Sequence, residues 1–219
     1  MHDLLNDLAK YVCGDFCFRL KFDEGQCIPK ATRHFSFAVN DVKCFDGFGS
    51  LTDAKRLRSF LPITQIGRTN FGRYDWQFKI SIHDLFSKFK FLCVLFFCRL
   101  ELKEVSDSIG DLKHLYSLNL SETKIQELPD SIYLLYNLLI LKLNNCLSLE
   151  ELPSNLYKLT KLHCLEFTKM LMHFGQLKNL QILNTFVVDI NSEFGTKQLE
   201  GLNLRGRLSI NEVQNVWMH

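Results

Sequence analysis

The segments LKHLYSLNL, at residues 112–120, and LYNLLILKL, at residues 135–143, decide the fold of this chain. Both follow the pattern Leu-x-x-Leu-x-x-Leu-x-Leu, and their first residues, Leu112 and Leu135, lie 23 positions apart. Further copies, with Phe in place of some leucines, are FKFLCVLFF from residue 89, LTKLHCLEF from residue 159 and a weaker LKNLQILNT from residue 177. One such unit cannot bury its own apolar face, so the repeat predicts a solenoid in which each unit stacks on the next.

Each copy contains an alternation of leucine with other residues, which predicts a short strand. Side chains on a strand point to opposite faces in turn, so the leucines point to the interior and the residues between them point outward. The expected parallel strands cover residues 94–97, 117–120, 140–143 and 164–167. One leucine from each strand is expected to be stacked and buried, namely Leu95, Leu118, Leu141 and Leu165.

The segments that follow the strands predict the opposite side of the solenoid. SETKIQELPDSIYLL, at 121–135, and NNCLSLEELPSNLYKL, at 144–159, place Thr123 and Cys146 inside a turn, where leucine-rich repeats carry Asn, Cys or Thr. A Leu-Pro pair then begins a return in irregular, 3₁₀ or helical structure. The predicted fold is therefore an α/β leucine-rich-repeat solenoid with short parallel strands on its concave side.

The outward-pointing residues of the predicted strands form the default binding face of such a scaffold. Their mixture of small, polar and charged side chains is typical of protein recognition. The candidate partner-binding residues are Phe96, Cys98, Ser117, Asn119, Ser121, Lys142, Asn144, Glu166 and Thr168.

The repeat fades on both sides of its regular part, which covers residues 89–185. Irregular repeats are expected over 30–88, with strands in RHFSFAV (33–39) and RLRSFLPI (56–63) and a helix over 80–89. Irregular repeats are also expected over 186–219, where alternating apolar residues between 202 and 210 predict one or two strands.

Composition restricts the class of protein. Hydrophobic residues make up 47% of the 219 residues and the net charge is +2, which indicates a globular chain and disfavours a nucleic-acid or membrane-surface partner. The longest apolar run, FLCVLFFC at 91–98, is too short to span a bilayer. The N-terminus does not resemble a signal peptide, so the eight cysteines are expected to be mostly buried thiols in the reducing cytoplasm.

For five groups of residues, a structural role is weighed against a functional one. Cys13, Cys17, Cys27, His34 and Cys44 match no zinc spacing, and Cys13 and Cys17 lie at the end of a predicted helix, so idle thiols are favoured over a metal site. His83 and Asp84 could suggest a catalytic pair, but no nucleophile pattern accompanies them, so a surface or capping role is favoured. Packing in the repeat accounts for the positions of Cys146 and Cys164 better than reactivity does. The basic cluster of Lys55, Arg56 and Arg58 is expected to be a solvated edge, in preference to a contact with the acidic surface of another domain. A role in packing is at least as well supported as a role in anchoring a partner for Tyr74 and Trp76.

The chain opens with MHDLLNDLAKYV, in which Asp3 can cap an amphipathic helix over residues 4–13. With FDGFGSLTDAKRLRSFLPI at 45–63 and the Leu-Pro repeats, this order of features resembles plant intracellular nucleotide-binding leucine-rich-repeat disease-resistance proteins. The resemblance implies an ATP/ADP switch in which His2 approaches the ADP β-phosphate and Asp3 supports its loop. Residues 1–14 would then be the end of a winged-helix subdomain, followed by part of the repeat array.

The sequence departs from that family pattern because it contains no G-x-x-x-x-G-K-[ST] phosphate loop. We therefore expect no nucleotide cofactor and no enzymatic activity for this chain. The resemblance implies an interaction and autoinhibitory module that contacts a pathogen-derived or guarded host protein, and the nucleotide-binding domain of the same receptor. A nucleotide switch, and a truncated gene product without independent activity, are the alternatives.

Overall fold

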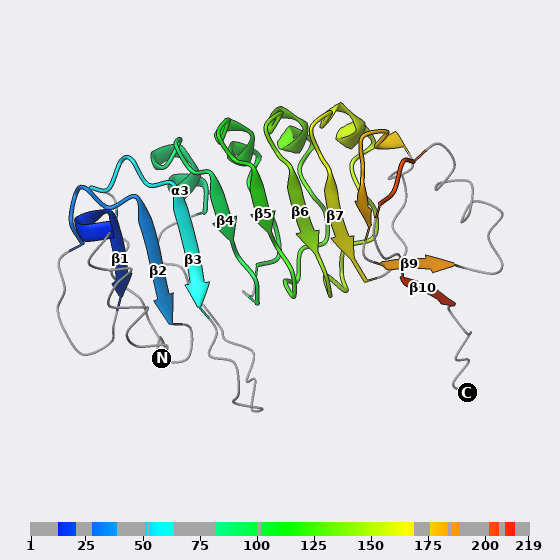
Figure 1. Ribbon diagram of the computed structural model, residues 1–219, viewed down its shortest axis with the longest axis horizontal. Helices are drawn as coiled ribbons and strands as arrows, with labels where there is room; N and C mark the ends of the chain where they lie inside the picture. Colours follow the sequence, from blue (N-terminus) through cyan, green and yellow to red (C-terminus); the bar gives the residue numbers. More distant parts are fainter. Residues whose placement is uncertain are drawn as a thin grey trace.

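The computed structural model describes residues 13–20, 28–38, 51, 53–63, 82–99, 102–168, 176–183, 185–188, 202–205 and 209–212, and all structural statements concern these residues. Its principal feature is an eight-stranded parallel sheet in which the strands follow one another in chain order (Figure 1). These strands are β1 (Cys17–Leu20), β2 (His34–Ala38), β3 (Ser59–Ile63), β4 (Val94–Phe96), β5 (Ser117–Asn119), β6 (Ile140–Leu143), β7 (Cys164–Phe167) and β8 (Ile182–Leu183). A parallel sheet in strict chain order is the arrangement of a solenoid, so the predicted fold class is confirmed.

The elements predicted from the repeat occur at the expected places. Strands β4 to β7 match the four predicted strands to within one residue, and β2, β3 and the helix α3 (Ile82–Lys88) lie in the segments predicted for them. A separate two-stranded parallel pair joins β9 (Thr185–Val188) to β10 (Ser209–Glu212). The helix predicted over 4–13 lies outside the described residues, apart from Cys13.

The first strand of the sheet was not predicted. Cys17 was expected at the end of a helix, but it begins β1, directly after the short 3₁₀ helix η1 (Gly14–Phe16). The prediction was wrong because β1 contains no leucine alternation of the regular kind. Its pairing with β2, in which Phe18 lies opposite Phe35, makes this segment a strand.

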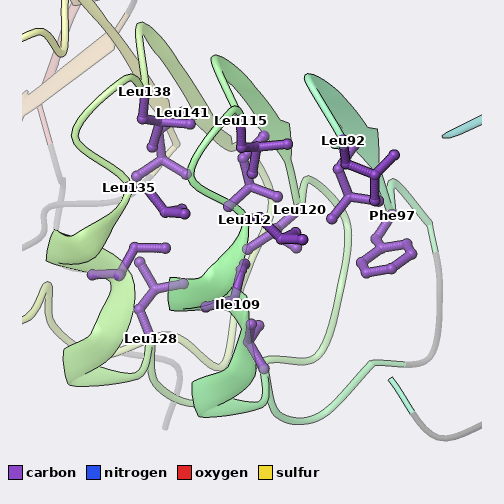
Figure 2. Packing of buried hydrophobic residues seen from close by; sticks show 14 of the residues in the cluster. Leu92, Phe97, Ile109, Leu112, Leu115, Leu120, Leu128, Leu135, Leu138 and Leu141 are labelled. Atoms are coloured by element: carbon purple, nitrogen blue, oxygen red, sulfur yellow. The ribbon is translucent and has the colours of Figure 1, made fainter. Parts of the chain in front are cut away.

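The core is a ladder of side chains that point inward from equivalent positions of the strands. The register pairs them across the whole sheet, in the order Phe18, Phe35, Phe60, Leu95, Leu118, Leu141, Leu165 and Leu183. From Phe35 onward each is almost completely buried, which confirms the burial predicted for Leu95, Leu118, Leu141 and Leu165. Figure 2 shows how further leucines, such as Leu112, Leu115, Leu135 and Leu138, fill the space between the strands and the return segments.

The ladder changes from phenylalanine to leucine between β3 and β4. Phe35 and Phe60 stack with ring centroids 5.8 Å apart, and Phe60 meets the ring of Phe97 edge to face at 5.9 Å. Phe97 in turn stacks on Phe86 of α3 at 6.1 Å. Aromatic rings therefore fill the core of the irregular units, where the Leu-x-x-Leu pattern is weakest.

The return segments of the regular units are single turns of 3₁₀ helix. They are η3 (Asp107–Asp111), η4 (Asp130–Leu134) and η5 (Ser154–Lys158). Each buries one apolar residue toward the core, Ile109, Ile132 or Leu156, because a 3₁₀ turn has room for little more. Within the described part of the chain, no helix has the length and apolar character that crossing a membrane requires.

A left-handed residue follows each of the strands β4, β5 and β6 at the same place. Arg99, Glu122 and Asn145 have φ values of 65°, 60° and 57°, a region that non-glycine residues rarely occupy. The N–H of Arg99 donates to the carbonyl oxygen of Ser121, and that of Glu122 donates to the carbonyl oxygen of Asn144, at 2.9 and 2.7 Å. These bonds extend the sheet ladder past the strands, which offsets the cost of the left-handed conformation.

Candidate protein-binding surface

The strands expose one face of the sheet, which we call the open face, on the side away from the leucine ladder. Alternation along the strands places its residues in rows that run across the sheet. The first row contains Cys17, His34, Ser59, Val94, Ser117, Ile140, Cys164 and Ile182. The second row contains Arg19, Ser36 and Leu61, followed by Phe96, Asn119, Lys142 and Glu166.

The predicted partner-binding residues lie together on this face. Ser117 belongs to the first row, and Phe96, Asn119, Lys142 and Glu166 are neighbours in the second. Four more residues lie one or two positions after the ends of the strands and form the rim of this face, namely Cys98, Ser121, Asn144 and Thr168. His2 and Asp3 lie outside the described residues, so their predicted contact with a nucleotide stays a prediction.

A polar cluster occupies the centre of the regular part. The Nζ of Lys142 lies 2.9 Å from Oε1 of Glu166, and Nδ2 of Asn144 donates to the other carboxylate oxygen, Oε2, also at 2.9 Å. The Glu166 side chain is only 11% exposed, whereas that of Lys142 is 35% exposed. The cluster therefore presents an ammonium group to a partner while its carboxylate is held below by two donors.

Hydrogen bonds also fix the side chains around this cluster. The backbone N–H of Ser121 donates to Oδ1 of Asn119 at 2.9 Å, and that of Asn145 donates to Oγ1 of Thr168 at 2.8 Å. Such bonds hold each side chain in one orientation before a partner arrives, which lowers the entropy lost on binding.

Apolar side chains lie beside these polar groups. Val94, Phe96 and Ile140 are half-buried on the open face, and Ile182 is 44% exposed at its end. The surface thus combines a few oriented polar groups with apolar area, which is the composition of protein interfaces.

Sequence reasoning missed half of the open face. The residues of β1 to β3, among them His34, whose Nδ1 lies 2.8 Å from Oγ of Ser59, were not proposed. Val94, Ile140, Cys164 and Ile182 were also missed. Each of these immediately precedes the first inward leucine of its strand, and applying the alternation one residue further would have found them.

The thiols of this surface are protonated. Burial raises the pKa of Cys98 to about 11, with a smaller contribution from the carboxylate of Glu122. Burial likewise raises the pKa of Cys164, and Glu166 adds to the rise. Cys146 is buried and donates from Sγ to the carbonyl oxygen of Leu120 at 3.1 Å, as expected for a packing residue.

No metal centre was found. Among the described residues, which include Cys13, Cys17 and His34 but not Cys27 or Cys44, no group of three or more His, Cys, Asp or Glu side chains could hold an ion. Cys17 has its pKa raised to about 11 by burial and by its hydrogen bond to Cys13, so it is a neutral thiol.

The remaining candidates lie away from the open face or outside the description. His83 is exposed on α3, where its Nδ1 lies 3.4 Å from Oγ of Ser106, a residue that caps η3. Lys55, Arg56 and Arg58 precede β3 and are exposed. Tyr74 and Trp76 lie outside the described residues.

Comparison with known proteins agrees with the fold. The model of the "leucine-rich repeat region" family matches residues 76–215. An Arabidopsis thaliana protein named as a candidate disease-resistance protein, At3g14460, is 38% identical over 99% of this chain, which spans 15% of that protein. The candidate disease-resistance RPP13-like protein 1 of the same plant is 33% identical over 63% of the chain, which spans 13% of it. The chain thus corresponds to a small part of the relatives it matches.

Solved structures show the same architecture at low sequence identity. The chain superposes on the plant peptide hormone receptor RGFR1, solved in complex with RGF2, with a TM-score of 0.57 and 20% identity. The superposition covers 88% of this chain and 35% of the receptor chain. This likeness concerns the fold alone.

Proposed function

This chain belongs to the leucine-rich-repeat family and is related to plant disease-resistance proteins, and on that premise we propose that it is the recognition module of a plant innate immune receptor. The open face would bind a pathogen-derived protein or a guarded host protein inside the plant cell, in the cytoplasm. The same module would restrain the receptor by contacting its nucleotide-binding domain, in a non-catalytic role.

The arrangement of Lys142, Asn144 and Glu166 carries this proposal. A carboxylate that is almost buried on a strand face costs free energy, and here two donors compensate it within the face itself. The result is a fixed ammonium group on the same face as two half-buried apolar residues, Ile140 two positions earlier on β6 and Phe96 two strands away on β4. A partner could place a carboxylate or carbonyl oxygen on Lys142 and apolar side chains on its neighbours.

Proximity labelling in plant leaves tests the role of the open face. The chain, fused to a biotin ligase, is expressed in healthy leaves and in leaves challenged with a plant pathogen. The open-face variant is Phe96→Arg with Ile140→Arg, which places two bulky cations on the same face as Lys142. The matched control is Leu147→Arg with Tyr157→Arg, two apolar residues that are 72% and 48% exposed outside the open face.

The proposal expects a set of labelled proteins that the control variant retains and the open-face variant loses. Both variants should melt at the temperature of the unmodified chain, since all four positions are at least partly exposed. If the folded open-face variant labels the same proteins as the control, recognition does not use this face and the proposal is wrong.

A further inference from the structure

A second surface lies along the edge where the chain enters the strands. All strands of the large sheet run parallel, so their first residues lie on one side (Figure 1). The residues immediately before them form a backbone ladder, which Arg205 continues beyond β8, and each N–H from Arg33 onward donates to the carbonyl oxygen of the unit before, at 2.6–3.0 Å. The ladder contains Phe16, Arg33, Arg58, Cys93, Tyr116, Leu139, His163, Gln181 and Arg205.

We define the entry edge as this ladder together with the turn leading to each of its residues. It comprises residues 13–16, 29–33, 53–58, 88–93, 111–116, 134–139, 158–163, 176–181 and 202–205. With a strand spacing of about 4.8 Å, its nine rungs extend over about 40 Å.

Charge on the entry edge is strongly one-sided. It carries 12 of the 26 lysines and arginines of the chain but only 3 of the 24 acidic residues, Asp15, Asp53 and Asp111. Its formal charge is therefore +9, although that of the whole chain is +2. The cluster Lys55, Arg56 and Arg58, which the sequence alone indicated to be a solvated edge, is one part of this longer feature.

Little on the edge neutralises this charge. The described residues of the edge form one ion pair, between the exposed Lys30 and Asp53 at 3.9 Å. Two other lysines of the edge donate hydrogen bonds to uncharged acceptors. Nζ of Lys161 donates to Oδ1 of Asn137 at 2.8 Å, and Nζ of Lys113 donates to the carbonyl oxygen of Leu134 at 3.4 Å. The ammonium groups of Lys161 and Lys113 are thus held in place by uncharged acceptors.

The middle of the edge is apolar. The turn over residues 134–139 carries no charge, and with its neighbours it presents Phe91, Tyr116 and Tyr136, which are 52%, 42% and 50% exposed. Basic residues lie on both sides of this centre, from Lys30 to Lys90 in one direction and from Lys158 to Arg205 in the other. An apolar centre within a charged rim is the anatomy of a protein interface.

Three aromatic rings of the edge already contact other side chains of the edge. The Arg33 guanidinium lies 4.5 Å from the centroid of the Phe16 ring, and His114 stacks on Phe91 at 5.6 Å. Nζ of Lys113 lies 5.4 Å from the centroid of Tyr136. Side chains of the edge thus already contact the rings of Phe16, Phe91 and Tyr136, which leaves fewer free ring faces for the stacking of single-stranded bases.

We propose that the entry edge binds an acidic protein segment, with apolar side chains at its centre and carboxylates on both sides. An extended segment of about twelve residues would match the length of the edge. This interaction is separate from the recognition proposed for the open face, because it uses the residues that precede the strands and not those of the strands themselves.

The test measures binding of a fluorescent peptide that has glutamate blocks on both sides of a Leu-Trp-Leu centre. The edge variant is Lys90→Glu with Lys178→Glu, two exposed lysines on the two sides of the apolar centre. The control is Lys103→Glu with Lys124→Glu, which makes the same change of net charge on the turns after the strands. A third variant, Tyr116→Ser, addresses the apolar centre, and circular dichroism confirms that each variant is folded.

We expect the edge variant to bind the peptide about ten-fold more weakly than the unmodified chain, while the control changes affinity by less than about three-fold. Tyr116→Ser should lower the affinity for the peptide but leave the affinity for poly-glutamate unchanged, because poly-glutamate has no apolar centre. Equal losses in the edge and control variants would show non-specific attraction and overturn the proposal. Tighter binding of an oligo-dT strand or of phosphatidylserine vesicles than of the peptide would overturn it as well.

Discussion

At the scale of single residues, the thiol of Cys98 shows how the rim of the open face controls reactivity. Burial is the main reason that its pKa rises from 9.0 to about 11, and the nearby carboxylate of Glu122 acts in the same direction, while Arg99 opposes the rise. Arg99 does so only partly, because its Nε donates to Oε2 of Glu122 at 2.9 Å. The thiol therefore stays protonated, and unreactive, at neutral pH.

This pKa leads to a prediction about pH. A raised pKa means that the folded protein holds the proton more tightly than the unfolded chain. The contribution of Cys98 to stability is therefore complete below pH 9 and is lost as the pH rises through 11. Alkylation of Cys98 by iodoacetamide should keep accelerating by up to about ten-fold per pH unit above pH 9, where a small free thiol has already levelled off. Peptide mapping by mass spectrometry measures both rates, and a plateau for Cys98 near pH 9 in the folded chain would contradict the prediction.

At the scale of elements, the 3₁₀ turns are packed against one another with little free space. Gly110 of η3 faces η4 so closely that a Cβ atom there would lie 2.9 Å from the carbonyl oxygen of Ser131 and 3.0 Å from Cδ1 of Leu134. The equivalent positions of the next two turns carry Tyr133 and Tyr157, so the repeat pattern alone does not indicate this crowding. The need for glycine follows from how η3 and η4 lie against each other.

Gly110→Ala is expected to destabilise the chain by about 1–3 kcal/mol, because the backbone of η4 must move to admit the methyl group. The measurement is urea unfolding followed by circular dichroism. Ser154→Ala, at the exposed start of η5, is the control and should change the free energy of unfolding by less than about 0.5 kcal/mol. If the Gly110→Ala variant is as stable as the control, η4 can move away from η3 without loss of folding free energy, and the prediction is wrong.

At the scale of the whole molecule, stability depends on neighbours in one dimension. Each interior strand pairs with the strand before and the strand after it, whereas β1 and β8 each pair with one strand of the large sheet. In such an array the free energy of opening a unit is the sum of its own stability and of its two interfaces. The middle units should therefore open least often.

Native-state hydrogen exchange should show this gradient. We expect the amides of β5 and β6 to be the best protected, and those of β1 and β8 to exchange faster by local opening. The amide of Leu139, which donates to the carbonyl oxygen of Tyr116 at 2.9 Å, is a suitable probe for the centre, and that of Gln181, which donates to His163, for the end. Uniform protection from β1 to β8 would indicate one cooperative unit and contradict the prediction.

Much of this architecture could be predicted from local pattern. The alternation that places Leu118 and Leu141 inside also places Asn119 and Lys142 outside, because successive side chains on a strand point to opposite faces. β1 and the part of the open face on β1 to β3 could not be predicted in this way. Phe18, Phe35 and Phe60 replace the leucines there, and the repeat becomes visible only when the strands are paired.

The sequence by itself therefore determined the period, the strands β4 to β7 and the inward leucines, since these depend on residues that are close together in the chain. Only the tertiary structure decided which side chains meet across units. In the folded chain, Lys142 and Asn144 contact the carboxylate of Glu166, and Gly110 packs against Ser131. Basic residues that are scattered in the sequence from Lys30 to Arg205 lie along one edge of the sheet. These contacts depend on the register between units, about 23 residues apart, and no local pattern specifies how one unit lies on the next.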